Sequence, residues 1–178
     1  MRDFQRLKRA FQGVEIVIHA AALKRVQTGI NDASELVKTN VQGTLNVIEA
    51  AHEAGVKKVL AISTDKACSP ISAYGASKLL MEKVITAANN AYGPRFSVIR
   101  LGNFAGSRGS VIDNWRHGGR EISDPDCTRF WITAKTACEA IETALTSMQG
   151  GETFMRNMKA FRLGDLAAAM RLTSLTLT

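Results

Sequence analysis

The chain has few of the residues that build disulfide scaffolds and metal sites, and it has no long apolar run. Its 3 cysteines, among 178 residues, lie far apart at Cys68, Cys127 and Cys138. An odd number at such spacing predicts free thiols, with neither a disulfide framework nor a metal site. No apolar run approaches the roughly 20 residues of a membrane helix, and the N-terminus lacks a signal-peptide core. We therefore expect a cytoplasmic protein with no metal and no membrane partner.

Aromatic residues are also scarce, at 6% of the chain, although 23 Lys and Arg outnumber 16 Asp and Glu to give a net charge of +7. Nucleic-acid-binding surfaces usually cluster their positive charges, whereas those of this chain are scattered and have few aromatic residues between them. We expect no nucleic-acid partner. An anionic small molecule such as a nucleotide sugar suits the same charge, and a merely basic surface is the alternative.

Two common phosphate-binding turns are missing from the sequence. No G-x-G-x-x-G turn lies between a strand and a helix, where a dinucleotide fold normally holds the pyrophosphate. The segment "GSRGS" at 106–110 lacks the lysine and the spacing of a Walker loop. The sequence therefore contains no turn from which phosphate binding could be predicted.

The apolar residues, 46% of the chain, are enough for the core of one domain and follow an alternating pattern. Helical spacing at 4–13, 33–54 and 72–91 alternates with strand-like runs at 14–22, 57–63 and 95–101. Ser72 is placed to cap the third helix. This order predicts an α/β fold with a parallel sheet that has helices on both faces.

The pattern changes after Leu101. Loops rich in glycine and turn residues at 102–110 and 118–127 precede a helix expected from Ala134 to about Met148. A short helical pattern then leads to "RLTSLTLT", which is either a frayed tail or a strand without neighbours. We predict a partial dinucleotide-binding core at 1–105 and a mixed segment at 106–178, with substrate-binding loops and a helix that returns to the core.

Tyr74 and Lys78 are the first candidates for chemistry. Four residues apart on a helix, they share one face about 6 Å apart, where an ammonium group would lower a phenol pKa from about 10. Such a tyrosine can take a proton from a hydroxyl, which Thr64 at the preceding strand end could also bind. A surface pair on the helix is the alternative reading of the spacing.

Several motifs in the same order resemble the extended short-chain dehydrogenase/reductase superfamily. They are "HAAALKRV", "KTNVQGTLNVIEAA", "VKKVLAISTDKA", "AYGASK", "FSVIRLGNFAGSRGSV" and "DPDCTRFWIT". Over roughly residues 1–170 they are similar to the UDP-N-acetylglucosamine 4,6-dehydratases, a family of polysaccharide-biosynthesis proteins. The resemblance implies a partial Rossmann-like, doubly wound parallel sheet with helices on both faces, plus part of a small substrate-binding region.

The resemblance also implies a reaction on UDP-N-acetylglucosamine or a related nucleotide sugar, with bound NADP, or NAD instead. Such enzymes oxidise C4, eliminate water across C5 and C6, and return the hydride to C6. Tyr74, assisted by Lys78 and Thr64, would take the C4 hydroxyl proton. Lys66 would be the base at C5, and Asp65 would protonate the departing C6 hydroxyl. A solvated loop pair is the plain alternative for Asp65 and Lys66.

Other site residues follow from the same resemblance. Asn40 would order the site, and His19 is expected to be structural. Trp115 and Trp131 are expected in the core or in a pocket wall. The cofactor would contact Ala20, Ala21, Ala22, Lys24, Tyr74 and Lys78, although strand-end packing also explains the alanines. The sugar and the diphosphate would contact Asn103, Ser107, Arg108 and Arg129. For Arg129 the alternative is an ordinary surface charge.

Departures from the family pattern keep other readings open. Members begin with glycine-rich strand-helix units, of which roughly 60 residues are missing before Met1, and they continue past the last helix. Gln27 and Asp113 stand where proline is common. The chain could instead be another extended-family epimerase or reductase, which would need no acid and base at Asp65 and Lys66. It could also be a non-catalytic remnant. In either case we expect a homo-oligomer through the helices near 33–54 and 72–91.

Overall fold

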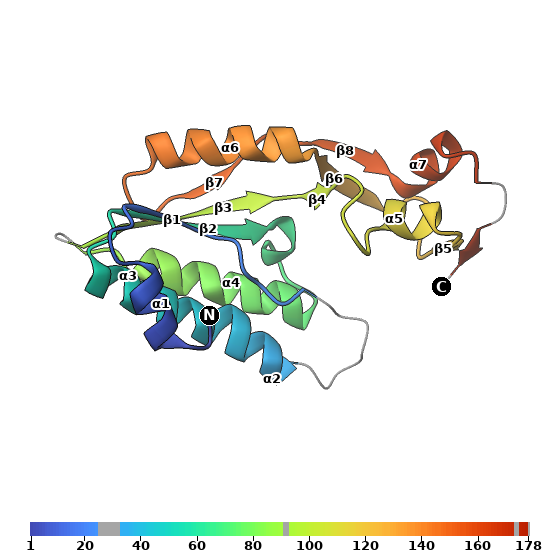
Figure 1. The fold of residues 1–178 in the computed structure, drawn as a ribbon. Coiled ribbons are helices and arrows are strands. Elements are labelled where there is room, and N and C mark those ends of the chain that lie inside the picture. Colours follow the sequence, from blue (N-terminus) through green and yellow to red (C-terminus); the bar gives the residue numbers. More distant parts are fainter. Residues whose placement is uncertain (25–32, 91–92, 173–174, 178) are drawn as a thin grey trace. The chain divides into compact units, whose positions relative to one another are not determined.

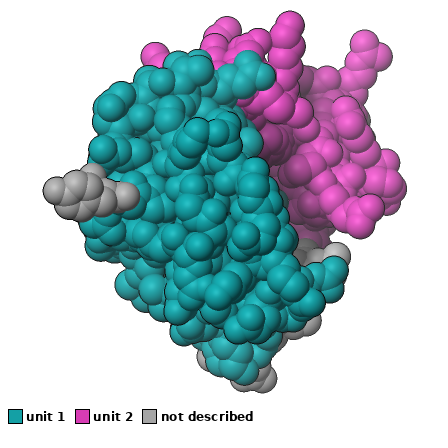
Figure 2. Space-filling view, turned by 60° about the vertical axis from the view of Figure 1, so that its left-hand side comes forward, with its two compact units in different colours: residues 1–100, 141–155 teal, residues 101–140, 156–178 magenta. Residues whose placement is uncertain are grey.

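The computed structural model describes residues 1–24, 33–90, 93–172 and 175–177. Gln27 lies outside these residues. The chain forms two compact units, coloured separately in Figure 2. Unit 1 contains residues 1–100 and 141–155, and unit 2 contains residues 101–140 and 156–178. Each unit has its own sheet and its own hydrophobic core, so each is described by itself.

The sheet of unit 1 has four strands in the order β1-β2-β3-β7 (Figure 1). They are β1 (Ile16–His19), β2 (Lys58–Thr64), β3 (Arg95–Leu101) and β7 (Thr153–Met155). β1 pairs with β2 in parallel, and β3 pairs with β7 in parallel. The strands predicted at 57–63 and 95–101 lie within one residue of β2 and β3, and the Rossmann-like parallel sheet is confirmed.

Helices cover both faces of this sheet, as the sequence predicts (Figure 1). One face carries α1 (Phe4–Ala10), α3 (Gly43–Ala54) and α4 (Ala73–Ala87), and the second half of α6 (Ala134–Ser147) lies on the other. The helix expected at 33–54 begins as α2 (Ala33–Leu36) and passes through a π-helical segment, η2 (Val37–Gln42), before α3. Gly55 ends α3 in the left-handed conformation, at φ 70°.

The core of unit 1 explains why these elements form. Apolar side chains at helical spacing on α3 and α4 pack against alternate residues of β2 and β3. Its fully buried members are Val47, Ala51, Val56, Val59, Ala61, Met81, Ile85, Phe96 and Val98. This packing fixes the carboxyl ends of β1 and β2 and the first turn of α4, which carry the predicted catalytic residues.

Unit 2 is built on a second sheet with the strand order β4-β6-β8. Its strands are β4 (Asn103–Phe104), β6 (Thr128–Ile132) and β8 (Lys159–Arg162), and its helices include α5 (Val111–Arg116) and α7 (Leu163–Ala169). Within the closing segment, β9 (Thr176–Leu177) is a strand with a neighbour, because it pairs in parallel with β5 (Glu121–Ile122). No helix in the described part of the chain is both long and apolar enough to span a membrane.

Candidate active site

The carboxyl end of β2 places three candidate residues in one tight turn. Thr64 caps the short 3-10 helix η3 (Asp65–Ala67), and its hydroxyl accepts a hydrogen bond from the Lys66 backbone N–H at 3.4 Å. The same hydroxyl donates to the Asp65 carboxylate at 2.9 Å. Because Thr64 is buried at the strand end, the turn has a fixed starting point. The cap therefore positions the Asp65 carboxylate.

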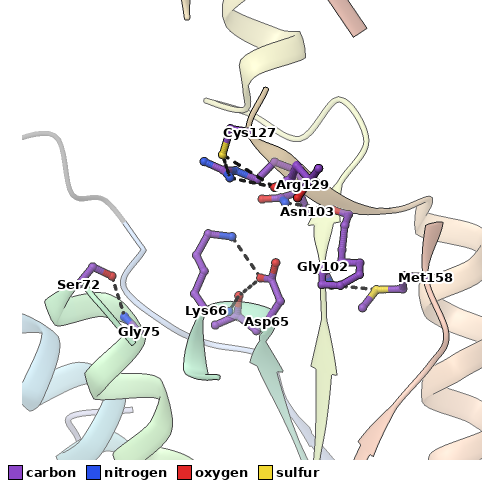
Figure 3. A network of polar contacts seen from close by, with 12 residues as sticks. Asp65, Lys66, Ser72, Gly75, Gly102, Asn103, Cys127, Arg129 and Met158 are labelled. Atoms are coloured by element: carbon purple, nitrogen blue, oxygen red, sulfur yellow. Dashed lines mark hydrogen bonds and ion pairs between the residues drawn. The ribbon is translucent and has the colours of Figure 1, made fainter. Parts of the chain in front are cut away.

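Asp65 and Lys66 form an ion pair within this turn (Figure 3). The Lys66 Nζ lies 3.2 Å from the Asp65 Oδ1. The Asp65 side chain is 16% exposed and the Lys66 side chain is 43% exposed. The pair is thus no freely solvated loop pair, because its carboxylate is largely covered and hydrogen-bonded to Thr64.

Tyr74 meets this turn from the first turn of α4. Ser72 caps α4 as predicted, since its hydroxyl accepts from the Gly75 N–H at 3.1 Å (Figure 3). Gly75 is buried, and a Cβ there would lie 2.4 Å from the Lys66 carbonyl oxygen. Only a residue without a side chain allows the helix to approach the turn so closely. The sequence analysis missed this glycine, although its place beside Tyr74 was a usable signal.

The acidity of Tyr74 differs from the prediction. Burial raises the pKa of the Tyr74 phenol, the negative charge of Asp65 raises it further, and a hydrogen bond with Thr64 lowers it. Lys78 was predicted to lower this pKa. Its ammonium group donates to the Ile62 carbonyl oxygen at 2.7 Å and also contacts the Met81 sulfur. Tyr74 is nevertheless close enough to Thr64 for a hydrogen bond, and close enough to Asp65 for the carboxylate charge to act on the phenol.

Lys78 is 3% exposed, and its ammonium group contacts the Ile62 carbonyl oxygen and the Met81 thioether. Burial lowers its pKa to about 8, and the charge of Glu82 acts in the opposite direction. A lysine with this pKa changes charge close to physiological pH. Its charge is therefore sensitive to whatever surrounds it.

Asn40 joins the end of β1 to the helix that carries Tyr74. Its side-chain oxygen accepts from the Leu23 N–H at 2.8 Å, and its amide donates to the Leu23 carbonyl and to the Ser77 hydroxyl, both at 3.0 Å. Ser77 in turn donates to the Tyr74 carbonyl at 2.8 Å. Asn40 is 1% exposed, so its side chain lies in the interior and not on an exposed helix face.

His19 is structural in this network. It is 5% exposed, and its Nε2 lies 3.0 Å from the Thr44 hydroxyl, which donates to the Asn40 carbonyl. Burial, together with the positive charge of Lys78, lowers the pKa of His19 to about 4. The imidazole is therefore neutral near pH 7, as a buried histidine without an acidic partner should be.

The segment after β1 fits a dinucleotide cofactor. Ala20, Ala21, Ala22 and Lys24 are exposed. Small side chains at the carboxyl end of a parallel strand let a ligand approach the backbone, and Asn40 fixes the segment through Leu23. In the described residues no three His, Cys, Asp or Glu side chains lie close enough to hold a metal ion.

The substrate candidates belong to unit 2. Asn103 on β4 donates to the Phe130 carbonyl of β6 at 3.0 Å. Arg129 on β6 donates to the Cys127 sulfur and, at 3.0 Å, to the Thr128 carbonyl. Ser107 is half-buried and Arg108 is exposed in the loop after β4. Thus Asn103 and Arg129 come from paired strands of one sheet, while Asp65 and Tyr74 belong to unit 1.

The two tryptophans differ in their surroundings. Trp115 is 3% exposed, and its indole N–H donates to the Glu121 carbonyl at 3.0 Å, so it is a core residue. Trp131 lines a cavity of about 200 Å³ between α5 and α7, and its buried indole N–H has no partner among the described residues. Both placements agree with the prediction of core or pocket wall.

Two residues that the sequence analysis did not single out form the main buried ion pair of unit 1. Glu82 on α4 is 3% exposed, and Arg100 on β3 donates two hydrogen bonds to its carboxylate. Ser63, which directly precedes Thr64, donates to the same carboxylate at 2.5 Å. The spacing offered a signal, because Glu82 follows Lys78 by four residues and so shares its buried helix face.

The sequence of the chain is similar to those of known nucleotide-sugar enzymes. A model of the family "polysaccharide biosynthesis protein" matches residues 1–178. Over 179 aligned residues the chain is 43% identical to the UDP-N-acetylglucosamine 4,6-dehydratase (inverting) of Campylobacter jejuni, covering 96% of this chain and 54% of the relative. It is 37% identical to the UDP-glucose 4-epimerase of Rickettsia typhi, covering 96% and 52%. The chain spans about half the length of the curated relatives it matches.

Solved structures extend the comparison to the fold. Pen from Bacillus thuringiensis superposes with a TM-score of 0.88 at 37% identity, covering 95% of this chain and 55% of that one. The dTDP-glucose 4,6-dehydratase of Streptomyces venezuelae, with NAD bound, gives a TM-score of 0.87 at 26% identity, covering 99% and 64%. The chain therefore belongs to the polysaccharide biosynthesis protein family, within the extended short-chain dehydrogenases/reductases.

Proposed function

We propose that the chain carries the catalytic residues of a nucleotide-sugar 4,6-dehydratase, acting on UDP-N-acetylglucosamine or a close relative with NADP or NAD. One observation carries this proposal: the ion pair of Asp65 and Lys66 adjoins Tyr74, so that the Asp65 charge acts on the phenol. A dehydration needs an acid and a base next to the group that handles the first proton. A cytoplasmic location and a division of labour between a cofactor part, 1–105, and a substrate part, 106–178, belong to the same proposal.

The proton transfers can be assigned to named atoms. Tyr74, once in its phenolate form, takes the C4 hydroxyl proton and becomes a neutral phenol, while the Thr64 hydroxyl orients that hydroxyl. The Lys66 amine takes the C5 proton, and the Asp65 carboxyl gives a proton to the C6 hydroxyl, which leaves as water. The dinucleotide, when bound, supplies the hydride transfer that begins and ends the reaction. In unit 2, Asn103, Ser107, Arg108 and Arg129 would bind the sugar and the diphosphate.

These roles require particular protonation states. Asp65 must hold a proton and Lys66 must be neutral at the moment of elimination, whereas an ion pair favours the opposite states. A proton that moves from the Lys66 ammonium to the Asp65 carboxylate, 3.2 Å away, produces both required states in one step. The pair therefore contains the proton that the acid needs.

The test is a product assay with UDP-N-acetylglucosamine and NADP. This chain is compared with the same chain joined to a glycine-rich N-terminal strand-helix unit. A 4-keto-6-deoxy product, lighter than the substrate by one water, is the expected result. Absence of this product from both proteins would overturn the proposal. Inversion at C4 without loss of water would instead favour an epimerase, the activity named for the Rickettsia relative.

Self-association is the second part of the proposal. Three large apolar side chains are exposed on the helices of unit 1: Val37 at 50%, Leu45 at 42% and Leu80 at 48%. Exposed apolar residues that recur on neighbouring helices are typical of interfaces. We therefore infer a homo-oligomer through the helices near 33–54 and 72–91.

A further inference from the structure

The glycine-rich loop after β4 ends in a four-residue turn that carries Arg108. The Ser110 N–H donates to the Ser107 carbonyl at 2.9 Å, which closes a β-turn over 107–110. Gly109, at the third position of the turn, has φ 70°, a conformation that type II turns require there and that glycine adopts without strain. Arg108 is exposed on this turn. The backbone of the turn therefore decides where the guanidinium group can reach.

Asp113, in the first turn of α5, binds this turn. Its Oδ2 accepts from the Gly109 N–H at 2.7 Å, and its own N–H donates at 3.3 Å to the Ser110 hydroxyl, which caps α5. In an ordinary capping box the acidic side chain reaches the N–H of the capping residue, whereas Asp113 reaches one residue further back. A proline, which is common at this position in the family, could make neither hydrogen bond.

The Asp113 carboxylate has two opposite effects on an anion that binds Arg108. Its negative charge repels the anion, although the Asp113 side chain is 26% exposed and charges in contact with solvent are screened over about 8 Å at physiological ionic strength. Its hydrogen bond to Gly109 orders the turn before any ligand arrives, so that less conformational freedom is lost on binding. The second effect depends on the geometry of the acceptor, and the first does not.

We propose that Asp113 is a positioning residue, which fixes the turn over 107–110 through the Gly109 N–H and so holds Arg108 ready for the diphosphate of a nucleotide sugar. That ligand rests on the function proposed above. A guanidinium group binds two phosphate oxygens at once only in a restricted orientation, and an ordered turn restricts that orientation in advance.

The experiment is a calorimetric titration of the chain and its variants with UDP. Asp113→Ala removes both the acceptor and the charge. Asp113→Asn is the matched control, because it removes the charge but keeps an oxygen that can accept from the Gly109 N–H. The Kd for UDP should rise about 5- to 10-fold in Asp113→Ala and stay within about twofold of its original value in Asp113→Asn. In the chain without ligand, amide exchange at Gly109 should become faster in Asp113→Ala only.

A double-variant cycle separates positioning from a general loss of structure. In an Arg108→Ala background, Asp113→Ala should raise the Kd no further, because the guanidinium group that the turn positions is gone. The fluorescence of Trp115 and Trp131, both in unit 2, checks that each variant is folded. Asp113→Leu, which has nearly the shape of aspartate but no acceptor, replaces Asp113→Ala if that variant does not fold.

Three results would overturn the proposal. They are an unchanged or lower Kd in a folded variant without the acceptor, an equal further loss in the Arg108→Ala background, and an unaltered chain that does not bind UDP. A chain that binds UDP with this dependence on Asp113 but forms no dehydrated sugar would refute the proposed function alone. Failure of the inference and failure of the proposed function are therefore distinguishable.

Discussion

In the proposed function, Asp65 and Lys66 are the residues that distinguish a dehydratase from an epimerase. Asp65→Asn removes the acid and Lys66→Met removes the base, while Tyr74 and Thr64 remain to act at C4. Each variant should therefore still oxidise C4 but fall about 10²–10⁴-fold in water elimination. The measurement combines the absorbance of the reduced nicotinamide with the mass of the sugar product.

Tyr74→Phe is the matched control for these two variants. It removes the proton acceptor of the first step, so both the reduced nicotinamide and the dehydrated sugar should disappear together. If Asp65→Asn and Lys66→Met eliminate water at the rate of the unaltered protein, the acid and base roles are wrong. The two residues would then be a structural ion pair.

His19 should make the stability of unit 1 depend on pH. Its pKa is about 4 in the folded chain and about 6.5 when unfolded, so the unfolded chain binds more protons between these values. The stabilisation is complete above about pH 6.5 and is lost as the pH falls towards about 4. The full effect is about 3 kcal/mol in the free energy of unfolding.

Urea denaturation at pH 7.5 and at pH 5 measures this effect. In His19→Gln the amide can still donate to the Thr44 hydroxyl but cannot titrate. The variant should lose less stability than the unaltered protein between the two pH values, because carboxylates titrate equally in both. Equal losses would show that His19 is already protonated, or exposed, in the folded chain.

At the scale of elements, the close approach of α4 to the turn at Asp65–Ala67 depends on Gly75. A Cβ at Gly75 would lie 2.4 Å from the Lys66 carbonyl oxygen, so Gly75→Ala must push the helix and the turn apart. We expect a loss of about 1–3 kcal/mol in the free energy of unfolding. We also expect a larger relative loss of activity, since Tyr74 moves away from Asp65.

Ala76→Ser is the control for this substitution, because Ala76 is exposed one residue further along the same helix. It should change neither quantity measurably. Chemical denaturation measures the free energy of unfolding of both variants, and the product assay measures their activity. A Gly75→Ala protein with normal activity would mean that the contact is not needed for the site.

The elements of unit 1 could be predicted because their signals are local. The Ser72 cap and the strands ending at Thr64 and Leu101 follow from spacing within a few residues. The π turn of η2 was not predicted, since one extra residue in a helical turn leaves apolar steps of three and four almost unchanged.

Contacts between distant elements set the limit of prediction. Helical spacing correctly placed Tyr74 and Lys78 on one helix, but it could not show which groups of other elements contact the ammonium group. The Lys78 ammonium donates to the Ile62 carbonyl, which belongs to another element. Likewise the pairing of β9 with β5 joins segments more than 50 residues apart, and no local pattern reveals it.

At the scale of the whole molecule, the proposed homo-oligomer predicts that the exposed apolar side chains on the helices of unit 1 form its interface. Leu80→Glu places a charge on α4 where the apolar side chain is 48% exposed. If these helices form the interface, burying that charge is costly and the oligomer should dissociate. The folded chain itself should be unaffected, because an exposed position accepts a charge readily.

Met155→Glu is the matched control, because Met155 is a 65% exposed apolar residue on β7, away from these helices. Analytical ultracentrifugation should show a halved mass for Leu80→Glu and an unchanged mass for Met155→Glu. A monomeric unaltered protein, or equal behaviour of the two variants, would exclude the helices as the interface.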